Sequence, residues 1–433
     1  MFPKRKPHSR FPLIPISLLI AFFSLFILYY YYMKRDSHFN ELSKTSTTLQ
    51  CSSQALALTE KFMWYAPHSG FSNQLLEFKH AVLIAGILNR TLVVPPVLDH
   101  HAVALGSCPK FRVVEPKDIR ISVWDHVLEL IRGGRYISIA EVIDISSLVS
   151  SSLVRVIDLR DFVSIWCGIS LDLACSNDSK SRSSASKSLE QCGSLLAGFH
   201  GNIEKCIYAV NEDCRTTVWT YHIDGRENGV LDSFQPDEQL KQKKKISYVR
   251  RRRDVFRMLG PGSEAESASM LAFGSLFSAT YKGSESYIDI HESHQDQRFL
   301  SLMEKIKFLP FVPEVMNAGK KFAKATIKAQ FFCAQLRLLD GQFKNHHKAT
   351  FDGLRQKLES LRQKGPLPIH IFVMTDLPRD NWTGGYTSSQ ETNCSGLRRE
   401  AVCSCASLGF IGTPGSTIAE NIELMSKFGS CST

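Results

Sequence analysis

The sequence lacks the motifs that identify several common classes of enzyme. No D-x-D is present, so the usual carboxylate pair that holds a divalent metal on a nucleotide-sugar is missing. Neither H-E-x-x-H nor G-x-S-x-G is present, although "HESH" at 291–294 comes near the first. The turn "GTPGST" at 412–417 has neither the lysine nor the spacing of a Walker loop. These absences argue against metal-dependent and nucleophile-elbow chemistry and against a P-loop enzyme.

Charged residues are absent from 11–32, a run about long enough to cross a bilayer core. A cleaved signal peptide is the competing interpretation, but the run exceeds a usual h-region and no small-x-small cleavage site follows it. Positive charge is denser before the run than after it, which predicts a cytoplasmic N-terminus. We therefore expect a cytoplasmic tail at 1–10, a transmembrane anchor at 11–32 and a stem at 33–60.

Two further features are typical of the lumen of the secretory pathway. The 12 cysteines are even in number and none lies in 11–32, which suits several disulfides, although their pairing cannot be deduced. Cys403 and Cys405 lack a second pair at zinc spacing, so we expect them in disulfides. Four N-glycosylation sequons are present, at Asn89, Asn177, Asn381 and Asn393. Together these features predict a single-pass type II protein of the Golgi membrane with a lumenal body.

Acidic residues are outnumbered, with 42 Asp and Glu against 52 Lys and Arg and a net charge of +10. Much of the excess lies in "KQKKKISYVRRRRD" at 241–254, which resembles a nuclear import signal. A lumenal chain does not meet that machinery, so we expect no nucleic-acid partner. A solvated loop and a patch for a polyanion such as pectin or proteoglycan both remain open.

Hydrophobic periodicity predicts a parallel α/β protein. A strand at 62–67, a helix over 75–90 and a strand at 91–98 form a βαβ unit, and 154–159 predicts another strand. The Ser-rich stretch 175–215 holds four cysteines and is interpreted as a disulfide-pinned insertion outside the core.

A second α/β set begins near residue 326. It comprises strands at 331–338, 369–376 and 407–412 and helices at 346–364 and 416–428. We expect two doubly wound domains, at 61–325 and 326–433, facing each other across a cleft.

Three segments end where such sheets bind ligands, beyond the carboxyl ends of strands. Gly70 allows close approach to a phosphate at the N-terminus of the next helix. On spacing alone, a tight turn with a helix-capping Asn73 is the favoured alternative. Ser416 offers a hydroxyl in "GTPGST", and Thr417 and Glu420 have capping-box spacing. Arg337 at a strand end could hold a diphosphate and neutralise its developing charge. A surface ion pair is the alternative for that arginine.

The charge-free run, "HSGFSNQLLEFKHAVLIAGILNRTLVVPPVLDHH", "QLR", "MTD" and "SLGFIGTPGSTIAENIELM" together resemble the plant O-fucosyltransferase family, relatives of the GDP-fucose protein O-fucosyltransferases. The resemblance covers about 60–350 and 367–430. It implies a GT-B-like fold of two Rossmann-like domains, with GDP-fucose held mainly by the second. It also implies an inverting, metal-independent transfer of fucose to a hydroxyl, without a cofactor, which fits the missing D-x-D.

The resemblance assigns roles to individual residues. Arg337 matches the catalytic arginine of the family's H-L-R motif, Glu400 matches an acidic residue for guanine, and Asp376 matches an aspartate that shapes the pocket. The positions expected to bind GDP-fucose are Gly70, Phe71, Ser72, Asn73, Gln335, Leu336, Asp376, Glu400, Ser416 and Thr417. The chain departs from the family pattern at Gln335, which replaces the histidine of H-L-R. It also departs at 377–399, which is short and polar where the family pattern leads us to expect another strand and helix.

Two other functions are weighed against this one. A catalytically weak member of the same fold could bind glycans or act as a scaffold in the assembly of wall polysaccharides. A sulfotransferase would share the type II topology, but "HSGFSNQ" lacks the Lys/Gly/Thr-rich loop that it needs. The acceptor stays open among protein Ser/Thr, pectic polysaccharide and arabinogalactan.

Overall fold

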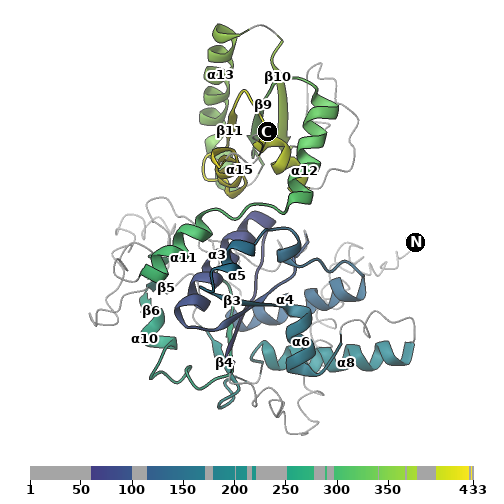
Figure 1. Ribbon diagram of the computed structural model, residues 1–433, viewed down its shortest axis with the longest axis vertical. Helices are drawn as coiled ribbons and strands as arrows, with labels where there is room; N and C mark the ends of the chain where they lie inside the picture. Colours follow the sequence, from purple (N-terminus) through teal and green to yellow (C-terminus); the bar gives the residue numbers. More distant parts are fainter. Residues whose placement is uncertain are drawn as a thin grey trace, which may run out of the picture. The chain divides into compact units, whose positions relative to one another are not determined.

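The computed structural model describes most of the chain after residue 59 (Figure 1). The described ranges are 60–99, 115–170, 179–199, 201–211, 217–220, 251–276, 288–289, 297–339, 341–365, 368–377, 396–428 and 431. The chain divides into two units, Met1–Gln50 and Cys51–Thr433, and every described residue belongs to the second. Among these residues no helix is long and apolar enough to cross a membrane. The predicted anchor at 11–32 lies outside them.

The larger sheet has five parallel strands in the order β3-β2-β1-β7-β4. The chain places β2 and β3 on one side of β1, and β7 and β4 on the other, so the sheet has its switch point at β1. Every residue of β1, β2 and β7 is buried. The strands are β1 (Phe62–Tyr65), β2 (Thr91–Val94), β3 (Arg155–Asp158), β4 (Ile207–Val210) and β7 (Met270–Phe273).

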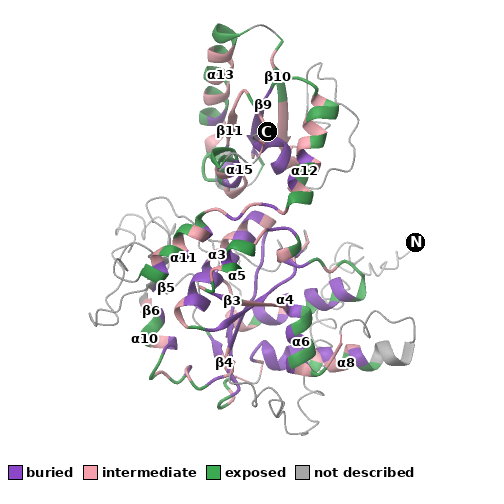
Figure 2. Cartoon of the chain, in the orientation of Figure 1, coloured by how far each residue is buried: buried purple, intermediate pink, exposed green. Residues whose placement is uncertain are grey.

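Helices cover both faces of this sheet, and most of the residues in its strands are buried (Figure 2). Successive residues of β1 point to opposite faces. Met63 and Tyr65 join one apolar cluster with α3 (Phe71–Ile87) and α11 (Gln297–Lys307). Phe62 and Trp64 join a second cluster with α4 (Pro116–Arg132), α6 (Leu159–Cys167) and α8 (Ser179–Leu196). Shorter helical segments are η2 (Ile139–Glu141), α5 (Ser146–Ser150) and α10 (Val255–Leu259).

A small parallel sheet in the order β6-β5-β8 accompanies the large one. It consists of β5 (Thr217–Thr220), β6 (Arg251–Asp254) and β8 (Ile288–Asp289). Trp219 of β5 is buried, and its ring lies edge-on to that of Phe273, at 6.1 Å between centroids. The last four residues of the basic run therefore form a strand, and the expectation of a loop is wrong for them. Residues 241–250 lie outside the described part.

The C-terminal sheet has three parallel strands in the order β10-β9-β11. They are β9 (Phe331–Leu336), β10 (His370–Thr375) and β11 (Phe410–Gly412). Its helical segments are α12 (Pro313–Phe322), η3 (Ala323–Ile327), η4 (Gly341–His346), α13 (His347–Lys364), α14 (Gly396–Ser404) and α15 (Thr417–Lys427). The chain moves from β9 to neighbours on either side, so β9 marks the switch point of this sheet. These elements confirm the strands and helices expected after residue 326.

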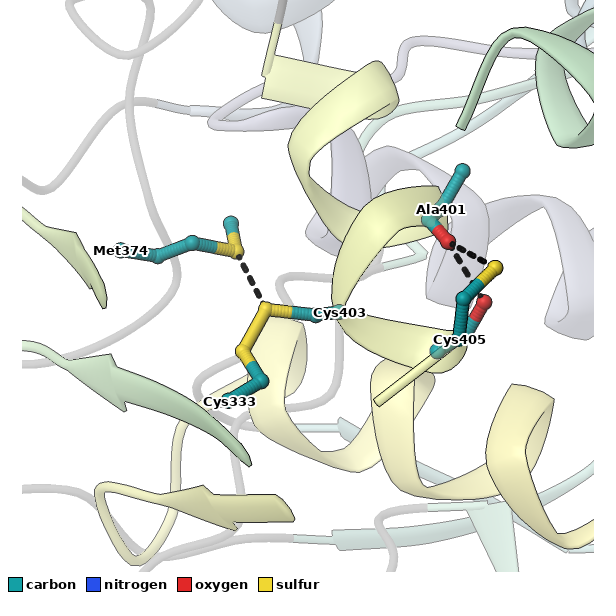
Figure 3. Close-up of a disulfide and its surroundings, with 6 residues drawn as sticks. Cys333, Met374, Ala401, Cys403 and Cys405 are labelled. Carbon is teal, nitrogen blue, oxygen red and sulfur yellow. Dashed lines mark hydrogen bonds between the residues drawn. A yellow bond between two sulfur atoms is a disulfide. The ribbon is translucent and has the colours of Figure 1, made fainter. Parts of the chain in front are cut away.

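Disulfides connect elements in both sheet regions. Cys167 is bonded to Cys192, and Cys206 also forms a disulfide. Near the C-terminus, Cys333 of β9 is bonded to Cys403 of α14, and Cys405 is bonded to Cys431. Figure 3 shows the first of these, with Sγ of Cys403 3.2 Å from Sδ of Met374. A disulfide sulfur has no proton to donate, so this is a sulfur–sulfur contact. The prediction that Cys403 and Cys405 form disulfides is confirmed.

The interpretation of 175–215 as an insertion outside the core is wrong. The stretch contains α8 and β4, and β4 is an edge strand of the large sheet. Four residues of α8 at helical spacing are buried in the second apolar cluster: Ala185, Leu189, Cys192 and Leu196. The serines between them conceal this stripe in the composition, because they occupy the other faces of the helix.

Three local boundaries also differ from the sequence predictions. The helix predicted over 75–90 begins earlier, at Phe71, so Asn73 lies inside it and does not cap it. The strand predicted over 91–98 ends at Val94 because Pro95 and Pro96 have no N–H for the ladder. The capping box expected at Thr417 is absent. Ser416 is the N-cap and its side chain makes no capping hydrogen bond. The Thr417 hydroxyl is hydrogen-bonded to Asn73 instead.

The domain boundary at 325/326 stays a prediction, because the residues from Cys51 onward form one unit. Helix α12 precedes that boundary yet packs against α14, where a Cβ on Gly319 would lie 2.7 Å from Cβ of Ala401. The parallel α/β class is confirmed.

Candidate functional site

Two helix N-termini meet where the sequence predicts phosphate-binding turns. The Thr417 hydroxyl in the first turn of α15 donates a hydrogen bond of 2.9 Å to Oδ1 of Asn73 in the first turn of α3. The N-caps, Gly70 and Ser416, provide no side-chain cap. The first N–H groups of a helix have no partner within it, and its N-terminus carries partial positive charge. Two such ends side by side are suited to binding an anion.

The β11–α15 turn is bonded to the carboxyl end of β9. Gly412 pairs with Gln335, and the Thr413 N–H donates to the Gln335 carbonyl at 3.0 Å. The Thr413 hydroxyl accepts from the Arg337 N–H at 2.9 Å. The Ser416 N–H donates to the Thr413 carbonyl at 3.2 Å. Thr413 therefore links the β9 end, with the predicted catalytic arginine, to the N-terminus of α15.

Three buried polar atoms at this place have no hydrogen-bond partner among the described residues. They are Oγ of Ser72, Oε1 of Gln335 and Oγ of Ser416. Their side chains are 8%, 4% and 0% exposed, respectively. Buried polar atoms in folded proteins are nearly always hydrogen-bonded. Ser72 and Ser416 are the chain neighbours of the bonded pair Asn73 and Thr417. Thr413 is bonded to both Gln335 and Ser416. These three residues are therefore candidates for binding a ligand at this place.

The Arg337 side chain is half-buried and its guanidinium lies over the ring of Phe343 in η4, 4.6 Å from the centroid. Asp376, at the end of β10, accepts from the N–H groups of Leu338 and Leu339 at 2.8 and 3.0 Å. Both carboxylate oxygens thus fix the backbone that follows Arg337. Asp376 shapes this loop through backbone contacts, and its predicted part in donor binding stays a prediction.

A hollow of about 470 Å³ adjoins the same turn, a size typical of small-molecule sites. Two carboxylates of α15, Glu420 and Glu423, line it, and burial together with the nearby Glu423 raises the pKa of Glu420. Carboxylates repel a diphosphate but accept hydrogen bonds from sugar hydroxyls and base N–H groups. The lining residues are Phe410, Ile411, Gly412, Thr413, Pro414, Gly415, Ser416, Ala419, Glu420 and Glu423.

Glu400 lies on α14 and does not line that hollow. Its side chain is 4% exposed, and one oxygen accepts a 2.8 Å hydrogen bond from Nδ2 of Asn421. Burial raises the pKa of Glu400 to about 7, which the Asn421 bond partly opposes. The role of Glu400 as the guanine ligand stays a prediction.

Two other predicted donor ligands face apolar partners. The Phe71 ring packs against that of Phe311, with centroids 6.2 Å apart, and Leu336 is 7% exposed within the apolar cluster beside α13. Gly70 is exposed, and a Cβ added to it would meet no atom within 4 Å. The site therefore unites Ser72, Asn73, Gln335, Ser416 and Thr417 more closely than Phe71 and Leu336.

Three residues at the site, Thr413, Glu420 and Glu423, were not predicted from the sequence as site residues. Thr413 offered one signal, a hydroxyl directly after the last strand. The two glutamates differ little in pattern from any exposed helix face. No group of three potential metal ligands occurs among the described residues. Of the four sequon asparagines, Asn89 is described and exposed, with its Oδ1 3.2 Å from Arg155, and the others lie outside the described ranges.

Comparison with known proteins provides the family. No family model matches the chain. O-fucosyltransferase 30 of Arabidopsis thaliana is 53% identical over 495 residues, covering 100% of this chain and 97% of the relative. The 495 aligned positions exceed the 433 residues of this chain by 62, so the relative contains internal segments that this chain lacks.

Two crystal structures of POFUT1 are also similar to the chain. The structure in complex with GDP-fucose is 13% identical, with 84% of this chain and 93% of that chain covered and a TM-score of 0.38. For the structure with GDP the identity is 14%, the coverage 85% and 96%, and the TM-score 0.40. The assignment rests on the Arabidopsis relative, whose identity extends over the whole chain. The chain therefore belongs to the O-fucosyltransferase family of enzymes.

Proposed function

We propose that this protein transfers fucose from GDP-fucose to a hydroxyl of a protein or cell-wall glycan acceptor, by inversion and without a metal. The observation that carries the proposal is the cluster of buried, unpartnered polar atoms beside two helix N-termini. The N-termini of α3 and α15 would bind the diphosphate, and the hydroxyls of Ser72 and Ser416 would donate to its oxygens. Gln335 is beside them and would complete the donor site.

Arg337 would serve as the catalytic cation. In an inverting transfer the acceptor oxygen bonds to C1 of fucose as the bond from C1 to the diphosphate oxygen breaks. Negative charge then grows on the GDP, and a guanidinium held at the end of β9 would stabilise it. The Phe343 ring beneath and the Asp376-bound loop restrict where that guanidinium lies. A fixed position matters because preorganised charge lowers the barrier most.

The donor and the metal independence are tested together. Purified residues 51–433 are incubated with radiolabelled GDP-fucose and candidate acceptors, with and without EDTA. The expected result is transfer to one acceptor class at the same rate in EDTA. Loss of transfer in EDTA that manganese restores would contradict metal independence. Peptides containing Ser and Thr, pectic fragments and arabinogalactan would be compared directly to identify the acceptor.

The location is tested independently of catalysis. We propose a Golgi type II protein with 11–32 as its anchor and with glycans on the lumenal body. Endoglycosidase treatment of the expressed full chain should then increase its gel mobility. An unglycosylated, cytosolic protein would contradict this topology and would revive the basic run as a nuclear signal.

A scaffold function is the second candidate, favoured by the small C-terminal sheet and by the segments that the Arabidopsis relative has in addition. Such a protein would bind a wall glycan without using GDP-fucose. GDP binding discriminates between the two, because an enzyme needs the nucleotide site and a scaffold does not.

A further inference from the structure

We propose that Glu77, His68 and Ser275 form a positioning network that holds the turn of Ser69 to Asn73 in its donor-binding geometry. The proposal rests on the proposed function and adds three residues that do not themselves touch the donor. It concerns the switch point of the large sheet, where loops leave β1 and β7 at the same edge.

Glu77 is fully buried on α3 and bonded to both of those loops. Its Oε1 accepts from the N–H of His68 at 3.1 Å, in the loop after β1. Its Oε2 accepts from the N–H of Leu276 at 3.3 Å, in the segment after β7. The Ser275 side chain is also hydrogen-bonded to it. One carboxyl group thereby connects the loop after β1 with the segment after β7. Glu77 and Leu276 are 199 positions apart in the sequence.

The His68 ring makes a second connection between the same loops. Its Nε2 is 2.6 Å from Oγ of Ser275, and its Nδ1 is 3.0 Å from Oγ of Ser69. The ring is fully buried, and burial lowers its pKa to about 4, so it is neutral at pH 7. A neutral ring donates at one nitrogen and accepts at the other. The ring can therefore bridge the two serines without carrying charge.

Two further titratable side chains beside this network, His80 and Tyr65, are buried as well. His80, one turn after Glu77, bonds the Leu276 carbonyl at 2.8 Å, and burial lowers its pKa to about 4. Tyr65 is fully buried near Glu77, and burial raises its pKa. Burial likewise raises the pKa of Glu77, against the opposing effect of its hydrogen bonds. The hydrogen bonds of Glu77 and His68 thus fix the geometry of both loops.

The network ends on the donor turn. Ser69 has φ of 69°, which is unfavourable for a residue with a Cβ, and its carbonyl is held by Nε2 of Gln74 at 2.8 Å. Glu77 follows Asn73 by one helical turn, so the two project from the same face of α3. Asn73 bonds Thr417, and Ser72 has one of the unpartnered hydroxyls. A shift of the loop at His68 would therefore move both donor-facing residues.

The experiment uses Ser275→Ala and Glu77→Gln in residues 51–433. Ser275→Ala removes one partner of the His68 ring from a half-buried position. Glu77→Gln keeps the shape but turns an amide N–H₂ toward a backbone N–H. Arg120→Met is the matched control: Arg120 is a fully buried hub bonded to Ala197, Val210 and Asn211, remote in sequence from the turn. For each variant we measure the melting temperature, kcat and KM for GDP-fucose, and the Kd for GDP.

Both test variants should lose about 10- to 100-fold in kcat/KM per folded molecule, because small displacements of positioning groups have effects of that order. GDP should bind about tenfold more weakly. Arg120→Met should melt earlier and yet retain kcat/KM within about threefold. If Ser275→Ala retains kcat/KM and GDP affinity, or if the control loses as much, the network is structural and the proposal is overturned.

A pair of substitutions at His68 separates positioning from proton transfer. His68→Gln places an amide near the former Nε2 and can still bond Ser275, whereas His68→Ala cannot. We expect Gln to recover most of the kcat lost in Ala, with the same pH profile between pH 6 and 8. Equal losses in both variants, or a profile that loses a limb in Gln, would mean that the ring transfers a proton, and positioning would be refuted. If the wild type bound GDP but did not turn over GDP-fucose, the proposed transfer would be contradicted. The GDP affinities of the wild type and the variants would then test the positioning network by themselves.

Discussion

The two larger sheets of this protein differ in how completely their strands are buried. In the five-stranded sheet, β1, β2 and β7 are buried at every residue, with an apolar cluster on each face. In the C-terminal sheet only β9 is buried throughout, and no residue of β10 or β11 is. Ile371 of β10 is 40% exposed and Phe351 of α13 is 44% exposed. Parallel sheets normally have both faces covered.

One of the two apolar clusters also includes Cys333 of β9 and Cys403 of α14, so the two regions share part of a core and differ in how their strands are covered. The large sheet buries enough apolar surface to hold its own strands. The C-terminal sheet has fewer strands. One disulfide joins α14 to the central strand, and a second involves Cys405, directly after α14. Small cores commonly need covalent links of this kind. The sequence predicts a reduction of the C-terminal region at 377–399.

Removing the Cys333–Cys403 disulfide should have the largest effect on stability. Its loop spans 70 residues, for which restriction of the unfolded chain is worth about 4 kcal/mol. We expect Cys333→Ala with Cys403→Ala to unfold the C-terminal sheet at lower denaturant while the five-stranded sheet is retained. Tryptophan fluorescence provides the measurement for the large sheet, since its buried tryptophans include Trp64 and Trp124. If both regions instead unfolded in one transition at lower denaturant, the disulfide would stabilise both sheets alike and the contrast between them would be wrong.

Arg337→Ala should have the largest effect on activity while leaving stability nearly unchanged. Loss of a preorganised charge contact typically costs about 3–4 kcal/mol of barrier, or about 10²–10³ in rate. Arg337→Lys should restore little, because a point charge does not reproduce the planar fork. Donor turnover and the melting temperature are compared with the wild type. Near-wild-type turnover in the alanine variant would support the surface-pair interpretation, and a melted variant would make Arg337 structural.

A matched pair of isoleucine substitutions tests the difference in burial. Ile84→Ala in α3 removes a fully buried side chain and should cost about 2–5 kcal/mol of unfolding free energy. Ile371→Ala in β10 removes a side chain that is 40% exposed, and should cost less than about 1 kcal/mol. Urea unfolding measures both. Equal losses would mean that β10 is covered in solution and that the contrast between the sheets is wrong.

Glu400 should make the C-terminal region more stable in mild acid. Burial raises its pKa to about 7 from the usual 4.5. Between these values the folded protein binds a proton that the unfolded chain has released, so stability falls as pH rises through that window. The full cost, at most about 3 kcal/mol, is present above pH 7 and absent below pH 4.5. Glu400→Gln should remove this dependence in melting temperatures at pH 5 and pH 8, and an unchanged pH slope would show that Glu400 is solvated.

Elements with a strong local pattern were predictable from the sequence. The run at 331–338 and the amphipathic stretch at 346–364 appear as β9 and α13 with nearly the expected ends. The stripe of α8 was missed because serines dominate its composition, although Ala185, Leu189, Cys192 and Leu196 recur at helical spacing. The turn residues of "GTPGST" predicted the position of the β11–α15 site. They did not predict that the Thr417 hydroxyl bonds Asn73, 344 residues away, rather than capping its own helix.

Long-range contacts account for most of what the sequence did not predict. Glu77 has the spacing of an ordinary helix residue, and its partner Leu276 lies 199 positions away in the sequence. Asp376 was predicted at a strand end, but only the structure shows that it fixes the backbone after Arg337. Hydrophobic periodicity is a local signal, whereas these polar contacts depend on which strands become neighbours.

Calorimetric titration of residues 51–433 with GDP tests the central claim most directly. The claim is that the end of β9, the β11–α15 turn and the N-terminus of α3 form the nucleotide site. We predict one GDP per chain, unaffected by EDTA, with affinity at least tenfold lower when Ser416→Val removes the buried hydroxyl. Ser146→Ala, at an exposed helix start remote in sequence from the site, serves as the control and should bind as the wild type does. A folded wild type that does not bind GDP, or a Ser416→Val variant that binds it equally well, would contradict the account.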